Sequence, residues 1–377
     1  MRVFIIAGEA SGDKLGAALM AGLSDLTDVT FDGVGGPFMQ AQGLKSRFPM
    51  DELSVMGLAE ILPKYRALKA RVTQMAQAVL DTKPDVLITI DSPDFCLRVA
   101  KRVKAQSDIR CVHYVAPTVW AWRPKRAVKM ARYIDQVLAL FPFEPPFMQA
   151  AGLRCDFVGH PVVIDLVATK AETDHWAGTS PLVMLLPGSR RGEVARLLPR
   201  FGAVAKLIAQ VHPDVRFALP TTANVYDAVV AGTADWDVRV QILTADQQAE
   251  KRGLFAAADV AVAASGTVSL ELAATDTPMV IAYDMAWISR VIIARMLLVD
   301  TVTLVNLVSD TRVIPEFIGK NCVPAPIAAA VIATLENPTA QRAAMADTMQ
   351  KLGRGGKAPG HRAAMAVLDG LSSARQE

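Results

Sequence analysis

The chain has 377 residues, of which 52% are hydrophobic and 20% charged, and a formal net charge of +3. This length exceeds the size at which one hydrophobic core usually stops growing, so we predict two domains. The small net charge argues against a nucleic-acid partner, while the apolar content favours either a large core or an apolar surface that meets lipid.

The cysteines and the apolar segments indicate the cellular compartment of the protein and whether it crosses a membrane. The four cysteines form no CxxC pair and the five histidines are scattered, so we expect a reducing compartment and no metal site. The first residues carry too short an apolar run for a signal peptide. The apolar stretch 291–308 is interrupted by Arg295 and Asp300, so it is too short to span a membrane. We expect a cytoplasmic protein that at most lies on a membrane surface.

Short β-rich runs alternate with helical patterns, which is typical of βαβ units and parallel sheets. The predicted strands are residues 3–7, 85–90, 111–115, 136–140 and 155–158 in the first half, and 182–186, 215–219, 238–243, 259–263 and 279–283 in the second. The polar segment 168–180 separates them. We therefore predict an α/β protein with two Rossmann-like lobes and a cleft between them, domain 1–167 and domain 168–350, with a last helix at 357–377 that packs back on the first. In such sheets ligands bind at the carboxyl ends of strands.

The turn after the first predicted strand reads Gly8-Glu9-Ala10-Ser11-Gly12-Asp13. It lacks the G-x-G-x-x-G dinucleotide pattern, and its acids would repel a pyrophosphate. We interpret Gly8, Glu9, Ser11, Gly12 and Asp13 as a site for a hydroxyl-rich sugar. The alternative is an ordinary capped helix start.

Apolar residues recur at helical spacing in segment 56–75, with basic residues mostly elsewhere. A basic amphipathic helix can lie in a membrane interface, and it can equally pack on a core. The residues predicted to face membrane or acyl chains are Met56, Leu58, Ile61, Leu62 and Tyr65.

Asp91 follows the predicted strand 85–90, in the sequence Asp91-Ser92-Pro93-Asp94. A carboxylate at this position can take the proton from an attacking sugar hydroxyl, so Asp91 is the candidate base. We expect Asp94 to cap the next helix.

A basic stretch begins at Trp120-Ala121-Trp122-Arg123 and continues to Arg132, with five cations in ten residues and no acid. It suits an anionic, lipid-bearing acceptor or lipid headgroups, with Trp122 and Arg123 on the acceptor side. A solvated helix face is the alternative.

Two glycine-containing turns follow predicted strands of the second half. Glycine lets backbone approach a ligand closely, and the N–H groups of a following helix start favour phosphate. Arg190 can also stabilise a leaving diphosphate, and Glu271 can accept hydrogen bonds from a ribose. Ordinary βα turns and a solvated glutamate are the alternatives. The candidate residues for binding a nucleotide diphosphate are Gly188, Ser189, Arg190, Ser265, Gly266, Thr267 and Glu271.

One D-x-D triplet, Asp235-Trp236-Asp237, precedes the predicted strand 238–243. It therefore lies at the amino end of that strand, away from the expected site. We interpret it as a turn and expect a mechanism that needs no metal ion or cofactor.

These motifs together resemble the lipid-A-disaccharide synthase family over essentially the whole chain. The resemblance rests on the residue 8–13 turn, Val55-Met56-Gly57, Asp91-Ser92-Pro93-Asp94-Phe95, Val119-Trp120-Ala121-Trp122-Arg123, Gly159-His160-Pro161, Leu186-Pro187-Gly188-Ser189-Arg190 and Ser265-Gly266-Thr267 with Glu271. It implies a GT-B-type fold, Asp91 as the catalytic aspartate and Asn306 as a further UDP-side residue. Val305 stands where the family often has proline.

The resemblance also implies the substrates and the setting. An inverting hexosyltransferase would join UDP-2,3-diacylglucosamine to 2,3-diacylglucosamine 1-phosphate, on the inner face of the inner membrane. A homodimer with an exchanged C-terminal segment is implied as well. A UDP-sugar 2-epimerase and a non-catalytic nucleotide-sugar binder are the alternatives from other classes.

Overall fold

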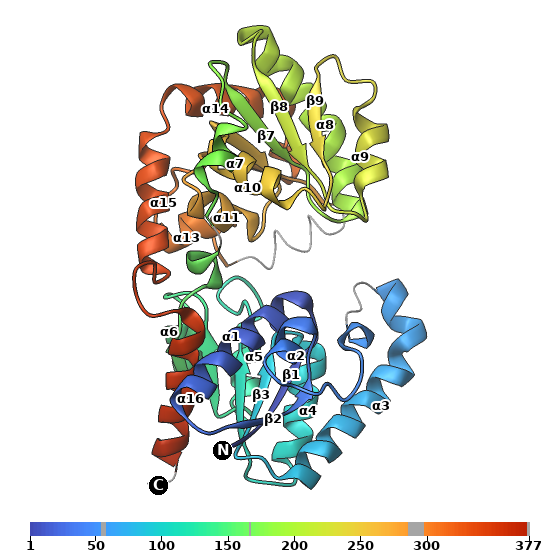
Figure 1. Cartoon of the computed structure of the whole chain (residues 1–377), viewed down its shortest axis with the longest axis vertical. Coiled ribbons are helices and arrows are strands. Elements are labelled where there is room, and N and C mark those ends of the chain that lie inside the picture. Colours follow the sequence, from blue (N-terminus) through green and yellow to red (C-terminus); the bar gives the residue numbers. More distant parts are fainter. Residues whose placement is uncertain (54–57, 166, 286–297, 375–377) are drawn as a thin grey trace. The chain divides into compact units, whose positions relative to one another are not determined.

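The computed structural model describes residues 1–53, 58–165, 167–285 and 298–374, apart from the side chains of 58–65 and 374. This part of the chain divides into two compact units. Unit 1 is Met1–Pro161 with Gly355–Glu377, and unit 2 is Val162–Arg354 (Figure 1).

Unit 1 is built on a six-stranded parallel sheet in the order β2-β1-β3-β4-β5-β6. The strands are β1 (Arg2–Ala7), β2 (Thr30–Val34), β3 (Val86–Ile90), β4 (Arg110–Tyr114), β5 (Gln136–Ala139) and β6 (Arg154–Phe157). The central strand β3 is buried along its whole length, as expected for a parallel sheet covered on both faces.

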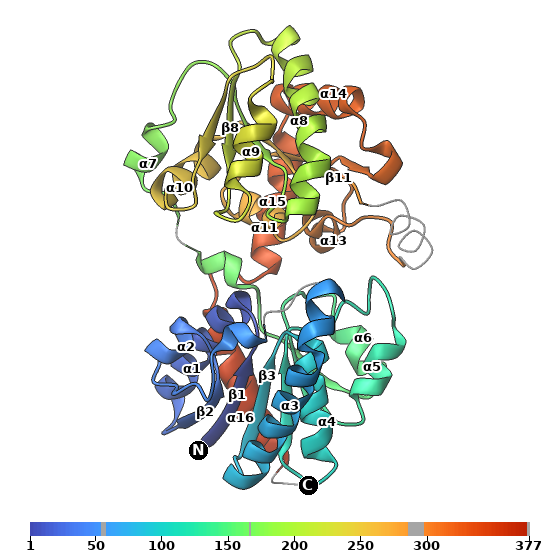
Figure 2. The same cartoon turned by 90° about the vertical axis from the view of Figure 1, so that its right-hand side faces the viewer.

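Helices cover both faces of this sheet. In Figure 2, α1 and α16 pack side by side on one face, while α3 and α4 pack together on the other. The helices are α1 (Ala10–Leu26), α2 (Pro37–Ala41), α3 (Leu58–Thr82), α4 (Pro93–Lys104), α5 (Lys125–Met130), α6 (Pro145–Gln149) and α16 (Pro359–Ala374).

Unit 2 has a second six-stranded parallel sheet, in the order β12-β11-β10-β7-β8-β9. Its strands are β7 (Leu182–Leu186), β8 (Arg216–Pro220), β9 (Val240–Leu243), β10 (Val260–Ala263), β11 (Met279–Tyr283) and β12 (Glu316–Ile318). A core of apolar side chains joins this sheet to α8 and α14. The described helices are α7 (Lys170–Asp174), α8 (Arg191–Val211), α9 (Tyr226–Thr233), α10 (Gln248–Ala257), α11 (Val268–Ala274), α13 (Leu304–Ser309), α14 (Pro324–Glu336) and α15 (Thr339–Lys351).

The predicted α/β class with two parallel sheets is confirmed, and each of the ten predicted strands matches an observed one. The sequence interpretation missed β2 and β12. Both are edge strands of their sheets, and neither has the continuous buried pattern that marks the central strands.

Each sheet has a point at which the strand order reverses, and it is there that open α/β sheets bind ligands. In unit 1 this switch lies between β1 and β3, whose last paired residues are Ala7 and Ile90. In unit 2 it lies between β7 and β10, which end level at Leu186 and Ala263. The four turns that leave these strands are the ones that the sequence singled out.

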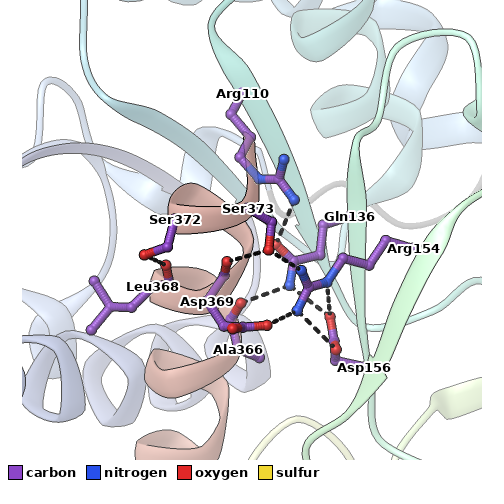
Figure 3. A network of polar contacts seen from close by, with 9 residues as sticks. All are labelled: Arg110, Gln136, Arg154, Asp156, Ala366, Leu368, Asp369, Ser372 and Ser373. Atoms are coloured by element: carbon purple, nitrogen blue, oxygen red, sulfur yellow. Dashed lines mark hydrogen bonds and ion pairs between the residues drawn. The ribbon is translucent and has the colours of Figure 1, made fainter. Parts of the chain in front are cut away.

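The C-terminal helix α16 is held on unit 1 by a polar network (Figure 3). The side-chain nitrogen of Gln136, which is fully buried, donates to the carbonyl oxygen of Ala366 at 2.8 Å. Arg154 pairs with Asp156 of its own strand and with Asp369 of α16. Residues far apart in sequence are therefore joined in one unit. None of the helices in the described ranges is long and apolar enough to span a bilayer.

Candidate active site

At the switch point of unit 1, the turns that follow β1 and β3 are in close contact. A β-carbon on Gly8 would lie 2.4 Å from the Ser92 hydroxyl oxygen, so only glycine fits. Gly12 lies at the start of α1 close to both strands, since a β-carbon there would be in ordinary contact with Ala7 at 3.4 Å and with Ile90 at 3.5 Å. The structure thus brings the predicted sugar turn and the predicted base onto neighbouring strand ends.

Asp91 is held in a strained backbone conformation, with a φ of 49°, and Ser92 follows with a φ of 40°. Positive φ costs a non-glycine residue energy, and such strain persists only where the surroundings impose it, often at functional sites. The Asp91 N–H donates to the Tyr114 carbonyl at 3.0 Å, which fixes the turn to β4. Burial raises the pKa of the Asp91 carboxyl above its usual value, which improves it as a proton acceptor.

Asp94 does not cap α4, contrary to our expectation. The capping position is Ser92 and the helix begins at Pro93, so Asp94 lies in the first turn with its side chain 95% exposed. The Arg126 guanidinium is 3.8 Å from its carboxylate. Proline suits the first helical position because its missing N–H has no helical partner there, and the cap therefore lies two residues earlier than predicted.

A pocket of about 310 Å³ opens beside this switch point. Its walls are mostly apolar and come from Leu53, from Leu68 and Val72 of α3, and from Phe95 of α4. Glu9 and Ser92 add polar atoms, and the Ser92 hydroxyl is buried without a hydrogen-bond partner among the described residues. A ligand hydroxyl would satisfy it. Among the described residues, Asp91 does not line this pocket.

Asp13 has a clear structural role. It is 1% exposed, and its carboxylate accepts the N–H groups of Gly36, Phe38 and Met39 at 2.9, 2.9 and 3.0 Å. These donors are at the start of α2, so Asp13 caps that helix from another element. A direct contact of Asp13 with a sugar stays a prediction, as does one by the exposed Ser11.

The Trp120–Arg123 stretch is anchored by an aromatic cluster. Trp120 packs edge-on against Phe143 at 5.1 Å, and Phe141 stacks on Phe143 at 5.4 Å. Phe141 also lies 5.5 Å from the His160 ring, which joins the Gly159-His160-Pro161 motif to the same cluster. These contacts leave the two predicted acceptor-side residues exposed.

Trp122 and Arg123 form a pair at the surface. The Arg123 guanidinium lies 4.2 Å from the Trp122 ring centre, and the Trp122 indole nitrogen donates to Thr118 at 2.7 Å. Arg123 has a φ of 54°, in the same left-handed region as Asp91 and Ser92. Their contact with an acceptor stays a prediction.

The amphipathic segment forms part of α3, whose far end packs on the core through Val72 and Met75. Core packing is therefore established for that end. Met56 lies outside the described residues, and so do the side chains of Leu58, Ile61, Leu62 and Tyr65. Their membrane or acyl-chain contact stays a prediction.

In unit 2, the turn after β7 places Gly188 in the left-handed region, with a φ of 104°. A β-carbon there would lie 2.7 Å from a carboxylate oxygen of Glu193. Glu193 accepts hydrogen bonds from Arg190 and from the Tyr283 hydroxyl, both at 3.2 Å. Arg190 is held beside the turn in this way, with 66% of its side chain exposed.

The turn after β10 is the neighbour of the Gly188–Arg190 turn. Ser265, Gly266 and Thr267 precede α11, and a β-carbon on Gly266 would meet nothing within 4 Å. Thr267 occupies the capping position of this helix without a side-chain bond to the described backbone. The Ser269 hydroxyl donates a hydrogen bond to the Gly266 carbonyl at 2.9 Å, so the side chain of the helix binds the backbone of the preceding loop.

Two further UDP-side predictions have different surroundings. Glu271 is half-buried on α11, and its carboxylate makes no hydrogen bond or ion pair to any residue in the described ranges. Asn306 is 1% exposed, and its carboxamide bonds to both the N–H and the carbonyl of Ile314 at 3.0 Å. Asn306 thus holds the chain around α13, and its contact with UDP stays a prediction.

The comparisons with known proteins agree with the motifs. The family model described as lipid-A-disaccharide synthetase matches residues 3–366. The chain belongs to this family. It is 59% identical to the lipid-A-disaccharide synthase of Ruegeria pomeroyi, over 98% of this chain and 96% of that protein. It is 44% identical to the corresponding synthase of Rhodospirillum centenum, over 97% of this chain and 94% of that protein.

Solved structures support the fold at lower identity. A putative UDP-N-acetylglucosamine 2-epimerase from Listeria monocytogenes superposes with a TM-score of 0.64 at 12% identity, covering 100% of this chain and 96% of the other. MurG from Acinetobacter baumannii gives a TM-score of 0.56 at 14% identity, with 99% of both chains covered. These likenesses concern the fold alone, and they confirm the GT-B type.

Two further features of this lipid-A-disaccharide synthetase family member have structural roles that the tertiary structure shows. The Asp235–Asp237 triplet lies before β9, where Asp237 pairs with Lys206 at 2.6 Å and Trp236 packs on Gly202. The sequence interpretation missed Glu193 as the partner of Arg190 and Tyr283 as a second donor to Glu193. The signal for Glu193 was its place three residues after Arg190 at a helix start, whereas nothing local marks Tyr283.

Proposed function

We propose that the protein transfers 2,3-diacylglucosamine from UDP-2,3-diacylglucosamine to 2,3-diacylglucosamine 1-phosphate. The products are UDP and the β-1,6-linked disaccharide 1-phosphate, the precursor of lipid A. Unit 1 holds the acceptor and unit 2 holds the UDP-sugar. The observation that carries this assignment is the pairing of the turns after β7 and β10 at one switch point, with Gly188–Arg190 beside Ser265–Thr267.

The donor side of the mechanism rests on unit 2. The backbone of the two glycine turns approaches the diphosphate, and Arg190 balances the charge that grows as UDP leaves. The Tyr283 hydroxyl and Arg190 both donate to Glu193, so this carboxylate orients the guanidinium before substrate arrives. Glu271 accepts hydrogen bonds from the ribose. Charge stabilisation by these groups needs no metal ion.

The acceptor side rests on unit 1. Asp91 removes the proton from the acceptor hydroxyl while that oxygen attacks the anomeric carbon of the donor. The bond from this carbon to the diphosphate oxygen breaks, and its electron pair leaves with UDP, so the configuration inverts in one displacement. The turn of Gly8, Glu9, Ser11, Gly12 and Asp13 and the Trp122–Arg123 pair position the acceptor.

The setting of the reaction follows from its substrates. Both are lipids with polar heads, so the enzyme works at the surface of a membrane, which we propose is the cytoplasmic face of the inner membrane. The amphipathic pattern of 56–75 and the basic residues near Trp122 support a peripheral contact. We also propose a homodimer, on the family resemblance alone.

The test of the base is the Asp91→Asn variant. Asparagine tolerates the positive φ of 49° at this position, so the fold is kept while the proton acceptor is removed. We expect loss of turnover by about a thousandfold or more, with UDP binding unchanged. Asp108→Asn, an exposed carboxylate of the same unit, is the matched control. Near-normal turnover of Asp91→Asn contradicts the role of Asp91.

The pH dependence of kcat/KM gives a second test of the role of the Asp91 carboxyl. Asp91 must be ionised to accept a proton, and burial raises its pKa above the usual 3.8. The acid limb of kcat/KM is therefore expected above that value, and it should be absent from the residual rate of Asp91→Asn.

The two alternatives are separated by the products. Incubation with both acylated sugars in detergent should release UDP only when the lipid acceptor is present. A UDP-sugar 2-epimerase would convert the donor without the acceptor, and a non-catalytic binder would retain UDP-sugar without turnover.

A further inference from the structure

A strongly basic groove of about 640 Å³ lies between α4 and α5 in unit 1. It is lined by six cations and one carboxylate, whereas the whole chain has a net charge of only +3. Arg98 and Lys101 come from α4, and the other four come from α5 and the turn before it. The lining residues with charge are Asp94, Arg98, Lys101, Arg123, Lys125, Arg126 and Lys129.

The fold itself does not use most of these charges. The side chains of Arg98, Lys101, Lys125 and Lys129 make no ion pair or hydrogen bond to any residue that the structure describes, whereas Arg126 lies 3.8 Å from the exposed Asp94 carboxylate. Other cations of α4 differ, since Lys104 pairs with Asp135 at 2.9 Å and Arg102 donates to Thr73 at 2.6 Å. Uncompensated like charges in a hollow raise the free energy of the folded chain, and an anionic ligand offsets that cost.

The basic groove adjoins the apolar pocket at the β1/β3 switch point. Pro93, Asp94 and Arg98 line both hollows, because α4 lies between α3 and α5 (Figure 2). One end of the combined site therefore offers apolar walls, with the Ser92 hydroxyl and Glu9 beside them, and the other offers guanidinium and ammonium groups. A ligand that fits it has a hydrophobic chain, hydroxyl groups and an anion in one molecule.

We propose that the α4–α5 groove binds the phosphate of the acceptor, with Arg98 and Arg126 as its principal ligands, while the adjoining pocket receives one of the acceptor's acyl chains. This inference rests on the proposed function, because the acceptor of that reaction carries both groups. The planar guanidinium group of an arginine can donate two parallel hydrogen bonds to two oxygens of one phosphate. The site is concave, with its cations on facing elements, which suits a single phosphate monoester better than the flat surface of a bilayer.

The placement also explains why two motifs of the family lie so far apart in sequence. The Asp91–Asp94 turn leads into α4, and the Trp122–Arg123 pair leads into α5, so each motif precedes a helix that lines the groove, and Pro93, Asp94 and Arg123 line it themselves. With the phosphate held there, the sugar ring is directed toward the strand ends that carry Glu9 and Asp91.

The test is direct binding, measured by titration calorimetry in neutral detergent without any UDP-sugar. The ligands are 2,3-diacylglucosamine 1-phosphate and the same molecule without its phosphate. The proteins are the full chain, Arg98→Gln, Arg126→Gln and the double variant. A charge-matched control is Lys45→Gln with Arg239→Gln, two exposed cations that do not line the groove. A third measurement is sedimentation with phosphatidylglycerol vesicles.

We expect each single variant to weaken binding of the phosphorylated ligand about tenfold and the double variant more, which corresponds to about 1.4 kcal/mol per guanidinium. Binding of the phosphate-free ligand, vesicle sedimentation and the control should be unchanged. The proposal is overturned if the wild-type protein does not prefer the phosphorylated ligand, or if the variants weaken both ligands equally. It is also overturned if they lose vesicle binding alone, which would make the groove a membrane contact.

Failure of the proposed function would look different. In that case the wild-type chain releases no UDP when both acylated sugars are supplied, whatever the binding measurements give. If the groove of such a protein still prefers the phosphorylated ligand, the proposed binding site is supported and the proposed transferase activity is rejected.

Discussion

The capping of α2 by Asp13 gives a sharp test of which residues in the first turn support the fold. Replacing Asp13 with alanine removes the acceptor of three backbone N–H groups, two of which, at Gly36 and Met39, are in buried positions. Hydrogen bonds to a charged group contribute about 1.5–3 kcal/mol each. Phe38 is 51% exposed and its N–H regains water, so we expect a loss of about 3–5 kcal/mol rather than the full sum.

Urea unfolding followed by circular dichroism measures this loss, and peptide-resolved hydrogen exchange locates it. The two units can unfold separately, so the change should appear in the transition of unit 1. Exchange should rise at Gly36, Phe38 and Met39. The control is Asp25→Ala, an exposed carboxylate on the same helix, with an expected change within about 0.5 kcal/mol. Unchanged stability and exchange in Asp13→Ala, together with lost acceptor binding, would refute the structural role and favour a sugar contact.

Three further predictions concern other parts of unit 1. Gly8→Ala should lose about 1–3 kcal/mol of stability because its methyl group meets the Ser92 hydroxyl, and Ser92→Gly in the same chain should restore part of it in a double-mutant cycle of urea unfolding. Burial raises the pKa of Glu144 to about 7 from 4.5, so its contribution to stability is complete below 4.5 and is lost as the pH rises through 7. Unfolding free energies measured across this range should therefore fall by at most about 3 kcal/mol, and a slope that persists in Glu144→Gln would count against this cause. Gln136→Leu leaves the Ala366 carbonyl without its buried donor, so it should cost about 1–3 kcal/mol and raise hydrogen exchange across α16; unaltered exchange there would show that the helix is held by other contacts.

Much of this molecule follows from local sequence patterns. Buried parallel strands are continuous apolar runs, so the central strands of both sheets are evident from their residues alone. A parallel sheet places all carboxyl ends of its strands on one edge, so the turns at Gly8, Asp91, Gly188 and Ser265 can be predicted as candidate sites from the sequence alone. Edge strands lack this signal. In β2 the residues Asp32 and Gly33 are typical of a turn, and only pairing with β1 makes them a strand.

The tertiary structure decided what each candidate side chain contacts. Asp13 caps a helix more than 20 residues away, Asn306 bonds to Ile314, and Glu193 orients Arg190 together with Tyr283 from another strand. The basic groove combines residues of two helices, which a linear charge count cannot detect. Local sequence determines which helices and strands form, because backbone propensity and the periodicity of buried residues depend on only a few neighbouring residues. The partners of a polar side chain depend on distant segments that only the folded chain brings within hydrogen-bonding distance.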